Sequence, residues 1–151
     1  MKSKKIKVML VIIIVLLLLD QTSKILISNF IKSDCVLIEN VLSLTKTQNE
    51  GVALGLNQNN ISNLILSIFV IFILFRFAIR QEKNINKIVV VCLSLIISGG
   101  ISNIIDRIFR GAVFDFIKLG SLPIFNFSDL LICVGWLIYV IYLLFFAFKT
   151  I

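Results

Sequence analysis

The stretch FNFSDLLICVGWLIYVIYLLFFAF, residues 125–148, decides the fold. Its last nineteen residues, Leu130 to Phe148, carry no charged side chain. About 20 apolar residues in a helix are enough to cross the hydrocarbon core of a bilayer. The stretch therefore predicts a membrane-spanning helix with an acid, Asp129, at its edge. An ionisable residue in such a position is a candidate for function.

Three further stretches are also apolar and long enough to span, at about residues 8–27, 61–79 and 88–105. Hydrophobic residues make up 59% of the chain and the mean hydropathy is +1.07, well above the values of soluble domains. A length of 151 residues suits one domain. We expect an all-α integral membrane protein, with four transmembrane helices in a single membrane-embedded domain over residues 1–151.

The N-terminus, MKSKKIKVML, has the basic start and apolar continuation of a secretory signal peptide. No small-residue cleavage site follows, and the apolar run passes instead through LLDQTSK into ILI. We expect an uncleaved first span rather than a removed signal.

The basic residues predict the orientation, because cytoplasmic segments are enriched in lysine and arginine. Nine of them, with the single acid Glu82, lie in the N-terminal tail, between the second and third spans, or at the C-terminus: Lys2, Lys4, Lys5, Lys7, Arg76, Arg80, Lys83, Lys87 and Lys149. We therefore expect both termini in the cytoplasm. The net charge of +7 needs no nucleic acid to explain it.

The remaining acids all belong to the opposite, outer half of the chain: Asp20, Asp34, Glu39, Glu50, Asp106, Asp115 and Asp129. The polar residues that interrupt the spans lie towards the same face. This distribution predicts a functional site at the outer boundary between membrane and water.

Two outer connections, residues 28–60 and 106–129, are longer than simple turns. CVLIENVLSLTKT, residues 35–47, is typical of one or two short strands. The alternation in the second connection predicts a hairpin or an irregular strand pair that returns Asp115 to the membrane surface. NEGVALGL, residues 49–56, indicates close backbone packing or unusual dihedral angles, and a tight turn before the second span has the same composition.

The chain has no histidine, which removes the commonest metal ligand and the usual base for a serine or cysteine nucleophile. Cys35, Cys92 and Cys133 are widely spaced, and we expect them to be small buried hydrophobes. Any chemistry must use carboxylates, lysines, arginines or hydroxyls.

Several polar residues of the spans have the spacing of structural pairs. Lys24 follows Asp20 by four residues, on the same helical face, and we expect this pair to be structural or orienting. Asp106 is adjacent to Arg107 and four residues from Arg110, so it is expected to be an ion-pair partner. Arg107 could hold a carboxylate bidentately or reach a lipid phosphate.

Asp115 and Asp129 differ from these acids because neither has a basic residue within two positions. Desolvation raises the pKa of a carboxyl group, and a second carboxyl group nearby raises one of the two further. A pair with one protonated and one ionised acid can hydrolyse an amide, as in aspartic proteases. The alternatives are a helix N-cap for Asp129 and an exposed strand residue for Asp115.

Five motifs occur in an order that resembles the lipoprotein signal peptidases, or signal peptidase II. They are DQTSK (20–24), NEGVALG (49–55), GGISNIIDR (99–107), VFDF (113–116) and FNFSD (125–129). The motifs depart from the family's usual residues in three places. Ser102 and Ser128 stand where glycine and alanine are usual, and Val52-Ala53-Leu54 replaces a common Ala-Ala-aromatic sequence.

The resemblance implies a catalytic dyad of Asp115 and Asp129, with a β-rich cradle on the extracytoplasmic face. It also implies residues that bind substrate or support the site: Asp20, Lys24, Asn49, Gly51, Asn103, Asp106, Arg107 and Asn126. The family removes signal peptides from bacterial prolipoproteins in the cytoplasmic membrane, cleaving before a diacylglyceryl-modified cysteine, without metal or cofactor. Prolipoproteins and membrane lipid are thus the expected partners, and a monomer is the expected state.

Two other classes of protein remain possible at this point. A small ion-coupled carrier or channel subunit would use intramembrane acids for proton transfer, although such sites usually lie near the midplane and often come with internal repeats. A non-catalytic assembly protein would not need Asp115 or Asp129.

Overall fold

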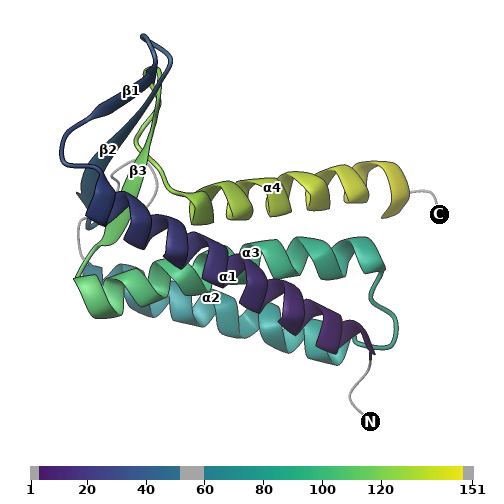
Figure 1. Cartoon of the computed structure of the whole chain (residues 1–151). Coiled ribbons are helices and arrows are strands. Elements are labelled where there is room, and N and C mark those ends of the chain that lie inside the picture. Colours follow the sequence, from purple (N-terminus) through teal and green to yellow (C-terminus); the bar gives the residue numbers. More distant parts are fainter. Residues whose placement is uncertain (1–3, 52–59, 148–151) are drawn as a thin grey trace.

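Four helices form the body of the protein, and a small sheet stands at one end of it (Figure 1). The computed structural model describes residues 4–51 and 60–147. The helices are α1 (Lys4–Phe30), α2 (Asn60–Arg80), α3 (Lys87–Arg110) and α4 (Phe127–Tyr142), which continues in a π-helical turn, Leu143–Ala147. All four are long and apolar enough to cross a membrane, as the sequence predicts.

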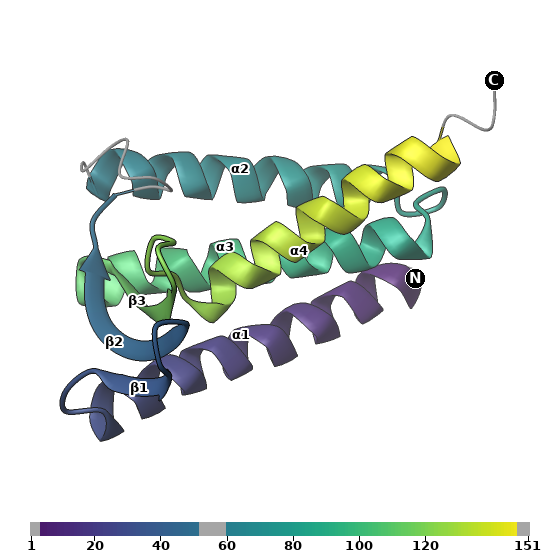
Figure 2. The same cartoon turned by 90° about the horizontal axis from the view of Figure 1, so that it is seen from above.

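Helix α3 is the central helix of the bundle. It packs against α1, α2 and α4, and Figure 2 shows it between α1 and α2 with α4 crossing over it. Buried apolar side chains of α1, α2 and α3 form the core of the bundle. They include Met9, Ala78, Val90 and Ile97. Large apolar side chains cover the outward faces, which suits helices surrounded by lipid.

Glycines allow α3 and α4 to approach closely. A Cβ atom at Gly99 would meet the backbone carbonyl of Ser128, and one at Gly135 would meet Ile96 and the carbonyl of Cys92. A Cβ atom at Gly100 would meet the side chain of Ile71 on α2. Small residues at helix interfaces have this function in membranes.

The sheet joins the two outer connections. Its strands β1 (Cys35–Ile38), β2 (Leu42–Asn49) and β3 (Val113–Leu119) are antiparallel in the order β1-β2-β3. The strands predicted within residues 35–47 are therefore confirmed. The register places Thr47 opposite Asp115, so β2 carries the first connection directly to one of the candidate acids.

The second connection forms an irregular strand pair, one of the two predicted alternatives, rather than a regular hairpin. Ile117 and Phe125 exchange backbone hydrogen bonds at an isolated bridge, while the main partner of β3 is β2. The physical reason is that β2 offers a longer run of backbone partners, whereas the segment opposite contains Pro123, which has no N–H to donate.

The third span is longer than predicted, because α3 continues to Arg110. Asp106 and Arg107 are therefore helical and do not belong to an outer connection 106–129. The helix ends where Gly111 adopts a left-handed conformation, with φ of 79°, as is common after a helix C-terminus. The charged side chains of this last turn are paired with polar groups inside the protein, which allows the helix to continue.

One smaller prediction is wrong, and another cannot be compared with the structure. Only Cys92 is a buried cysteine, whereas Cys35 and Cys133 are exposed. The predicted close packing around Ala53 and Gly55, and the Val52–Leu54 departure, lie outside the described residues.

Candidate active site

The two candidate acids lie where the sheet meets the outer end of the bundle. Asp115, on β3, is only 1% exposed, so the exposed-strand alternative is wrong. Asp129 lies in the first turn of α4, but the N-cap of that helix is Asn126. Asp129 is therefore not the N-cap, and its carboxylate oxygen Oδ2 accepts a 3.2 Å hydrogen bond from the backbone N–H of Asn126.

Asn126 connects the two acids. Its side-chain Nδ2 donates to Oδ1 of Asp115 at 2.6 Å, while its Oδ1 accepts from the backbone N–H of Asp129 at 2.9 Å. Together with the bond from its own N–H, this is a capping box at the start of α4. The local signal that begins the helix thus also fixes Asp115 and Asp129 relative to each other.

Two more asparagines donate to the acids. Nδ2 of Asn49, at the end of β2, donates to Oδ2 of Asp115 at 2.9 Å. Nδ2 of Asn103, on α3, donates to Oδ1 of Asp129 at 2.9 Å. Each of the four carboxylate oxygens therefore has a donor, from three different elements. Because a carboxylate oxygen has two lone pairs, each can still accept a bond from water or substrate.

Burial raises the pKa of Asp115 from its ordinary value of 3.8 to about 6. The hydrogen bond from Asn49 opposes the rise, the negative charge of Asp129 adds to it, and the bond from Asn126 and the charge of Lys24 lower it. A carboxyl group in this range can exist in both protonation states near neutral pH, as a general acid or base requires.

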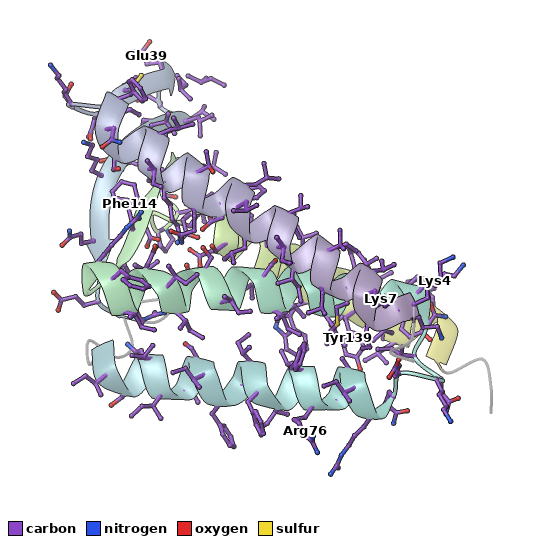
Figure 3. All side chains as sticks on the ribbon, turned by 60° about the horizontal axis from the view of Figure 1, so that its bottom comes forward. Lys4, Lys7, Glu39, Arg76, Phe114 and Tyr139 are labelled. Carbon is purple, nitrogen blue, oxygen red and sulfur yellow. The ribbon has the colours of Figure 1, made fainter. Side chains whose placement is uncertain are left out.

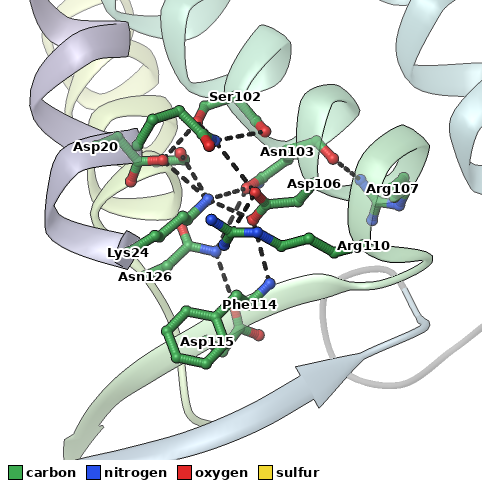
Figure 4. A network of polar contacts seen from close by, with 12 residues as sticks. Asp20, Lys24, Ser102, Asn103, Asp106, Arg107, Arg110, Phe114, Asp115 and Asn126 are labelled. Carbon is green, nitrogen blue, oxygen red and sulfur yellow. Dashed lines mark hydrogen bonds and ion pairs between the residues drawn. The ribbon is translucent and has the colours of Figure 1, made fainter. Parts of the chain in front are cut away.

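A buried ion network lies directly behind the acids (Figure 4). The ammonium of Lys24 is 2.8 Å from Oδ2 of Asp20 and 2.7 Å from Oδ2 of Asp106, and all three side chains are fully buried. The predicted Asp20–Lys24 pair is confirmed. Asp106 also accepts a bond from the backbone N–H of Phe114 at 3.2 Å, so the network touches the strand residue that precedes Asp115.

The sequence predicted no role in this network for Gln21, or for Ser102, which it marked only as a replacement of a usual glycine. The Ser102 hydroxyl donates to Oδ2 of Asp20. The side-chain amide of Gln21 also belongs to the network: its Nε2 donates to Oγ of Ser102 at 2.7 Å and to Oδ1 of Asp106 at 3.1 Å. Both residues belong to the family-like motifs, since Gln21 lies within DQTSK and Ser102 replaces a usual glycine. Their hydrogen-bond partners could not be predicted, because these depend on how the helices pack.

Asp106 forms its second ion pair with Arg110, at 3.4 Å, rather than with the adjacent Arg107. Residues four apart share a helical face, whereas neighbours in sequence do not. Arg107 instead donates to the carbonyls of Gly51, at 3.1 Å, and Asn103, at 3.4 Å. The expected bidentate grip on a carboxylate is not seen among the described residues.

The segment after β2 is held at two successive carbonyls. Arg107 of α3 binds that of Gly51, and Nδ2 of Asn63, on α2, donates to that of Glu50 at 3.1 Å. These contacts fix the end of β2, and with it Asn49, beside the acids. The sequence reasoning did not include Asn63.

Two adjoining cavities reach the acids. The larger, about 560 Å³, is lined by Asp129, Asn103, Arg107 and several apolar side chains of α4 and of the segment before it. The other, about 460 Å³, is lined by Asp115 and residues of β2. Both share Asn49, Gly51, Pro123 and Ile124. The described residues contain no group of three or more acidic or cysteine side chains that could hold a metal ion.

Comparison with known proteins identifies the family of the chain. A family model described as signal peptidase (SPase) II matches residues 12–145. The chain belongs to the signal peptidase II family. The membership confirms the resemblance seen in the five motifs and makes the chain a membrane peptidase, rather than an ion-coupled carrier or a non-catalytic assembly protein.

Individual relatives support the family assignment. A lipoprotein signal peptidase from Wigglesworthia glossinidia brevipalpis is 40% identical over 124 residues, which cover 78% of this chain and 80% of that protein. Two solved structures of bacterial membrane enzymes, obtained by the in meso method at 2.3 and 1.9 Å resolution, are similar in fold. Their TM-scores are 0.82 and 0.81 at 28% and 29% identity, and the matches cover 92% and 93% of this chain and 88% and 95% of theirs.

Proposed function

We propose that the chain cleaves bacterial prolipoproteins before their diacylglyceryl-modified cysteine, with Asp115 and Asp129 as the catalytic pair. The observation that carries this proposal is that one residue, Asn126, donates to both carboxylates, through its side chain to Asp115 and through its backbone N–H to Asp129, although the two acids come from β3 and α4. The cavities beside the acids leave room for a peptide. In this proposal the whole chain is one peptidase unit and works as a monomer.

The two acids have different roles in amide hydrolysis. The ionised carboxylate accepts a proton from a water molecule, whose oxygen then adds to the scissile carbonyl carbon. The protonated carboxyl group donates a hydrogen bond, and then its proton, to the carbonyl oxygen. Collapse of the tetrahedral intermediate breaks the C–N bond, and the leaving amine takes a proton from the pair. The raised pKa of Asp115 allows two such states to coexist near neutral pH.

The three asparagines act as positioning residues. Asn49, Asn103 and Asn126 donate to the carboxylates and hold their orientation before substrate arrives. Preorganised groups contribute to rate because they need not rearrange during the reaction. Asp20, Lys24 and Asp106 support them from behind, and Arg107 fixes the Gly51 carbonyl.

The depth of the site suits a lipid-modified substrate. The larger cavity combines Asp129 with apolar side chains, including Leu122, Phe125 and Ile132. A diacylglyceryl cysteine keeps its acyl chains in the bilayer, so its scissile bond is held near the membrane surface.

The basic residues support cytoplasmic termini, because the structure gathers Lys4, Lys7 and Arg80 away from the sheet, as Figure 3 illustrates for Lys4 and Lys7. The acids then face the extracytoplasmic side.

A cleavage assay tests the proposal. The purified full chain, in detergent or bilayers, is incubated with a diacylglyceryl-modified prolipoprotein and with its unmodified precursor. We expect cleavage of the modified form only. Asp115→Asn or Asp129→Asn should lower the rate about 10³-fold or more, since each removes a group that transfers a proton.

Glu39→Gln is the matched control, because Glu39 is an exposed acid beyond the end of β1. It should leave the rate unchanged. Thermal unfolding of each variant verifies the fold. Normal cleavage by either aspartate variant would remove that residue from the pair, and equal cleavage of both precursors would refute the role of the lipid.

A further inference from the structure

A groove lies at the opposite end of the bundle from the acids. This groove of about 530 Å³ between α1 and α3 is lined by Lys4, Lys5, Val8, Lys87, Val90 and Val91. Its volume is within the range of small-molecule sites. Neither the cleavage reaction nor the buried ion network uses any of these residues.

The groove has a cationic mouth. Lys4 and Lys87 are exposed at the starts of α1 and α3. Lys5 is held in place, because its Nζ donates to the carbonyls of Lys83, at 3.2 Å, and Ile85, at 2.8 Å. Neither helix has an acid in its first turn, so the partial positive charges of the two helix N-termini add to those of the ammonium groups. None of the described lining residues is acidic.

The inner part of the groove is apolar. Val90 is buried and forms its base, while Val8 and Val91 are 46% and 41% exposed on either side. These valines belong to helices that are long and apolar enough to span the membrane. The groove therefore combines positive charge at the membrane surface with an apolar channel that extends towards the hydrocarbon.

We propose that this groove binds one anionic phospholipid, with its phosphate at Lys4 and Lys87 and part of an acyl chain against the three valines. The charge pattern favours an anion, and the valines favour an acyl chain over a soluble phosphate. The arrangement differs from a general attraction of basic residues to an anionic leaflet, because it predicts one saturable site at a defined place. The proposal is independent of the catalytic assignment.

Native mass spectrometry of the full chain tests the proposal, with diacyl phosphatidylglycerol and diacyl phosphatidylcholine as probes at equal concentrations. We expect one tightly retained phosphatidylglycerol and weaker retention of phosphatidylcholine. The double variant Lys4→Gln/Lys87→Gln should weaken phosphatidylglycerol binding by up to about thirtyfold, since each lysine loses an exposed ion pair with the phosphate that contributes up to about 1 kcal/mol.

The matched control is Arg80→Gln/Lys83→Gln, which removes the same charge at the same end of the bundle but outside the groove. Its effect should stay within about threefold. Equal losses of phosphatidylglycerol affinity in the two double variants would show that the lipid is held by general surface attraction, and would overturn the proposal.

Two further arms test the acyl-chain contact. Val91→Trp fills the apolar part without a change of charge and should also weaken phosphatidylglycerol binding; unchanged binding would contradict the proposed pose. Inorganic phosphate should not compete at concentrations comparable to the lipid, and effective competition would identify an anion site instead of a lipid site. Cleavage of the modified precursor or a thermal unfolding transition verifies that each variant is folded.

Discussion

The ammonium of Lys24 lies 3.3 Å from Oδ1 of Asn103, whose Nδ2 donates a 2.9 Å hydrogen bond to Asp129. Lys24 therefore determines which end of the Asn103 amide faces the catalytic acid, because an ammonium can only donate. The same ammonium forms ion pairs with Asp20 and Asp106. The buried network and the proposed active site are thus one connected structure.

Lys24→Met should destabilise the protein by about 3–5 kcal/mol, because it leaves two buried acids without their shared cation. It should also lower kcat more than it raises KM, since Asn103 is then free to turn its amide. Thermal unfolding and cleavage kinetics measure the two effects. Lys46→Met is the control, because Lys46 is exposed and, among the described residues, bonds to the carbonyl of Ser28 alone. Equal stability of the two variants would show that Lys24 is dispensable.

Ser102→Ala should cost about 1–3 kcal/mol, because it removes a buried donor to the charged Asp20. Cleavage should change only a few-fold, since the Lys24–Asn103 contact remains. Ser98→Ala is the matched control on the same helix, because that hydroxyl bonds only to the nearby carbonyl of Leu95. It should cost clearly less in the same thermal measurement. If both substitutions have the same effect, the Ser102–Asp20 bond contributes nothing specific.

Asn126→Asp should preserve the cap of α4 but impair catalysis. The new carboxylate still accepts from the backbone N–H of Asp129, but it cannot donate to Asp115, and its charge raises the pKa of Asp115 further. We expect a roughly 10²-fold lower cleavage rate, the usual cost of a misplaced catalytic group. Asn86→Asp makes the same change at the N-cap of α3 and should leave the rate unaltered. A normal rate in Asn126→Asp would exclude the positioning role.

The raised pKa of Asp115 predicts how stability depends on pH. The native state holds this proton up to about pH 6, whereas the unfolded chain releases it near pH 3.8. The native state thus binds more protons in this window, and stability falls as pH rises from about 4 to about 6, by about 3 kcal/mol. Asp115→Asn should abolish this component of the pH dependence. Thermal unfolding at several pH values measures it, and identical profiles for variant and wild type would refute the assignment.

The sequence predicted the features that depend on local composition. Long uncharged runs such as Leu130–Phe148 identify the spans, because the bilayer requires a minimum apolar length. Asp115 and Asp129 stood out because each is an acid among apolar neighbours, and the fold buries Asp115 and half-buries Asp129. The Asp20–Lys24 pair followed from helical spacing alone.

Features that depend on contacts between distant segments could not be predicted. The pairing of β3 with β2 depends on a register that only the folded connections determine. Asn126 was assigned a supporting position by resemblance, but its bonds to both acids require β3 and α4 to be in place. The end of α3 was missed because Asp106 and Arg107 appear too polar for a span until their buried partners are known.

Gly99→Ala should separate α4 from α3 and displace Asp129. The added Cβ atom would meet the carbonyl of Ser128, a backbone group that cannot rotate away. Overpacking of this kind costs about 1–3 kcal/mol, and we expect a lower unfolding temperature together with slower cleavage. Gly100→Ala provides the comparison, because its Cβ atom would meet only the Ile71 side chain, which can change rotamer. Since Ile71 belongs to α2 rather than to α4, which carries Asp129, that variant should retain most of its activity. Equal activity losses would indicate that close α3–α4 packing does not set the position of the acid.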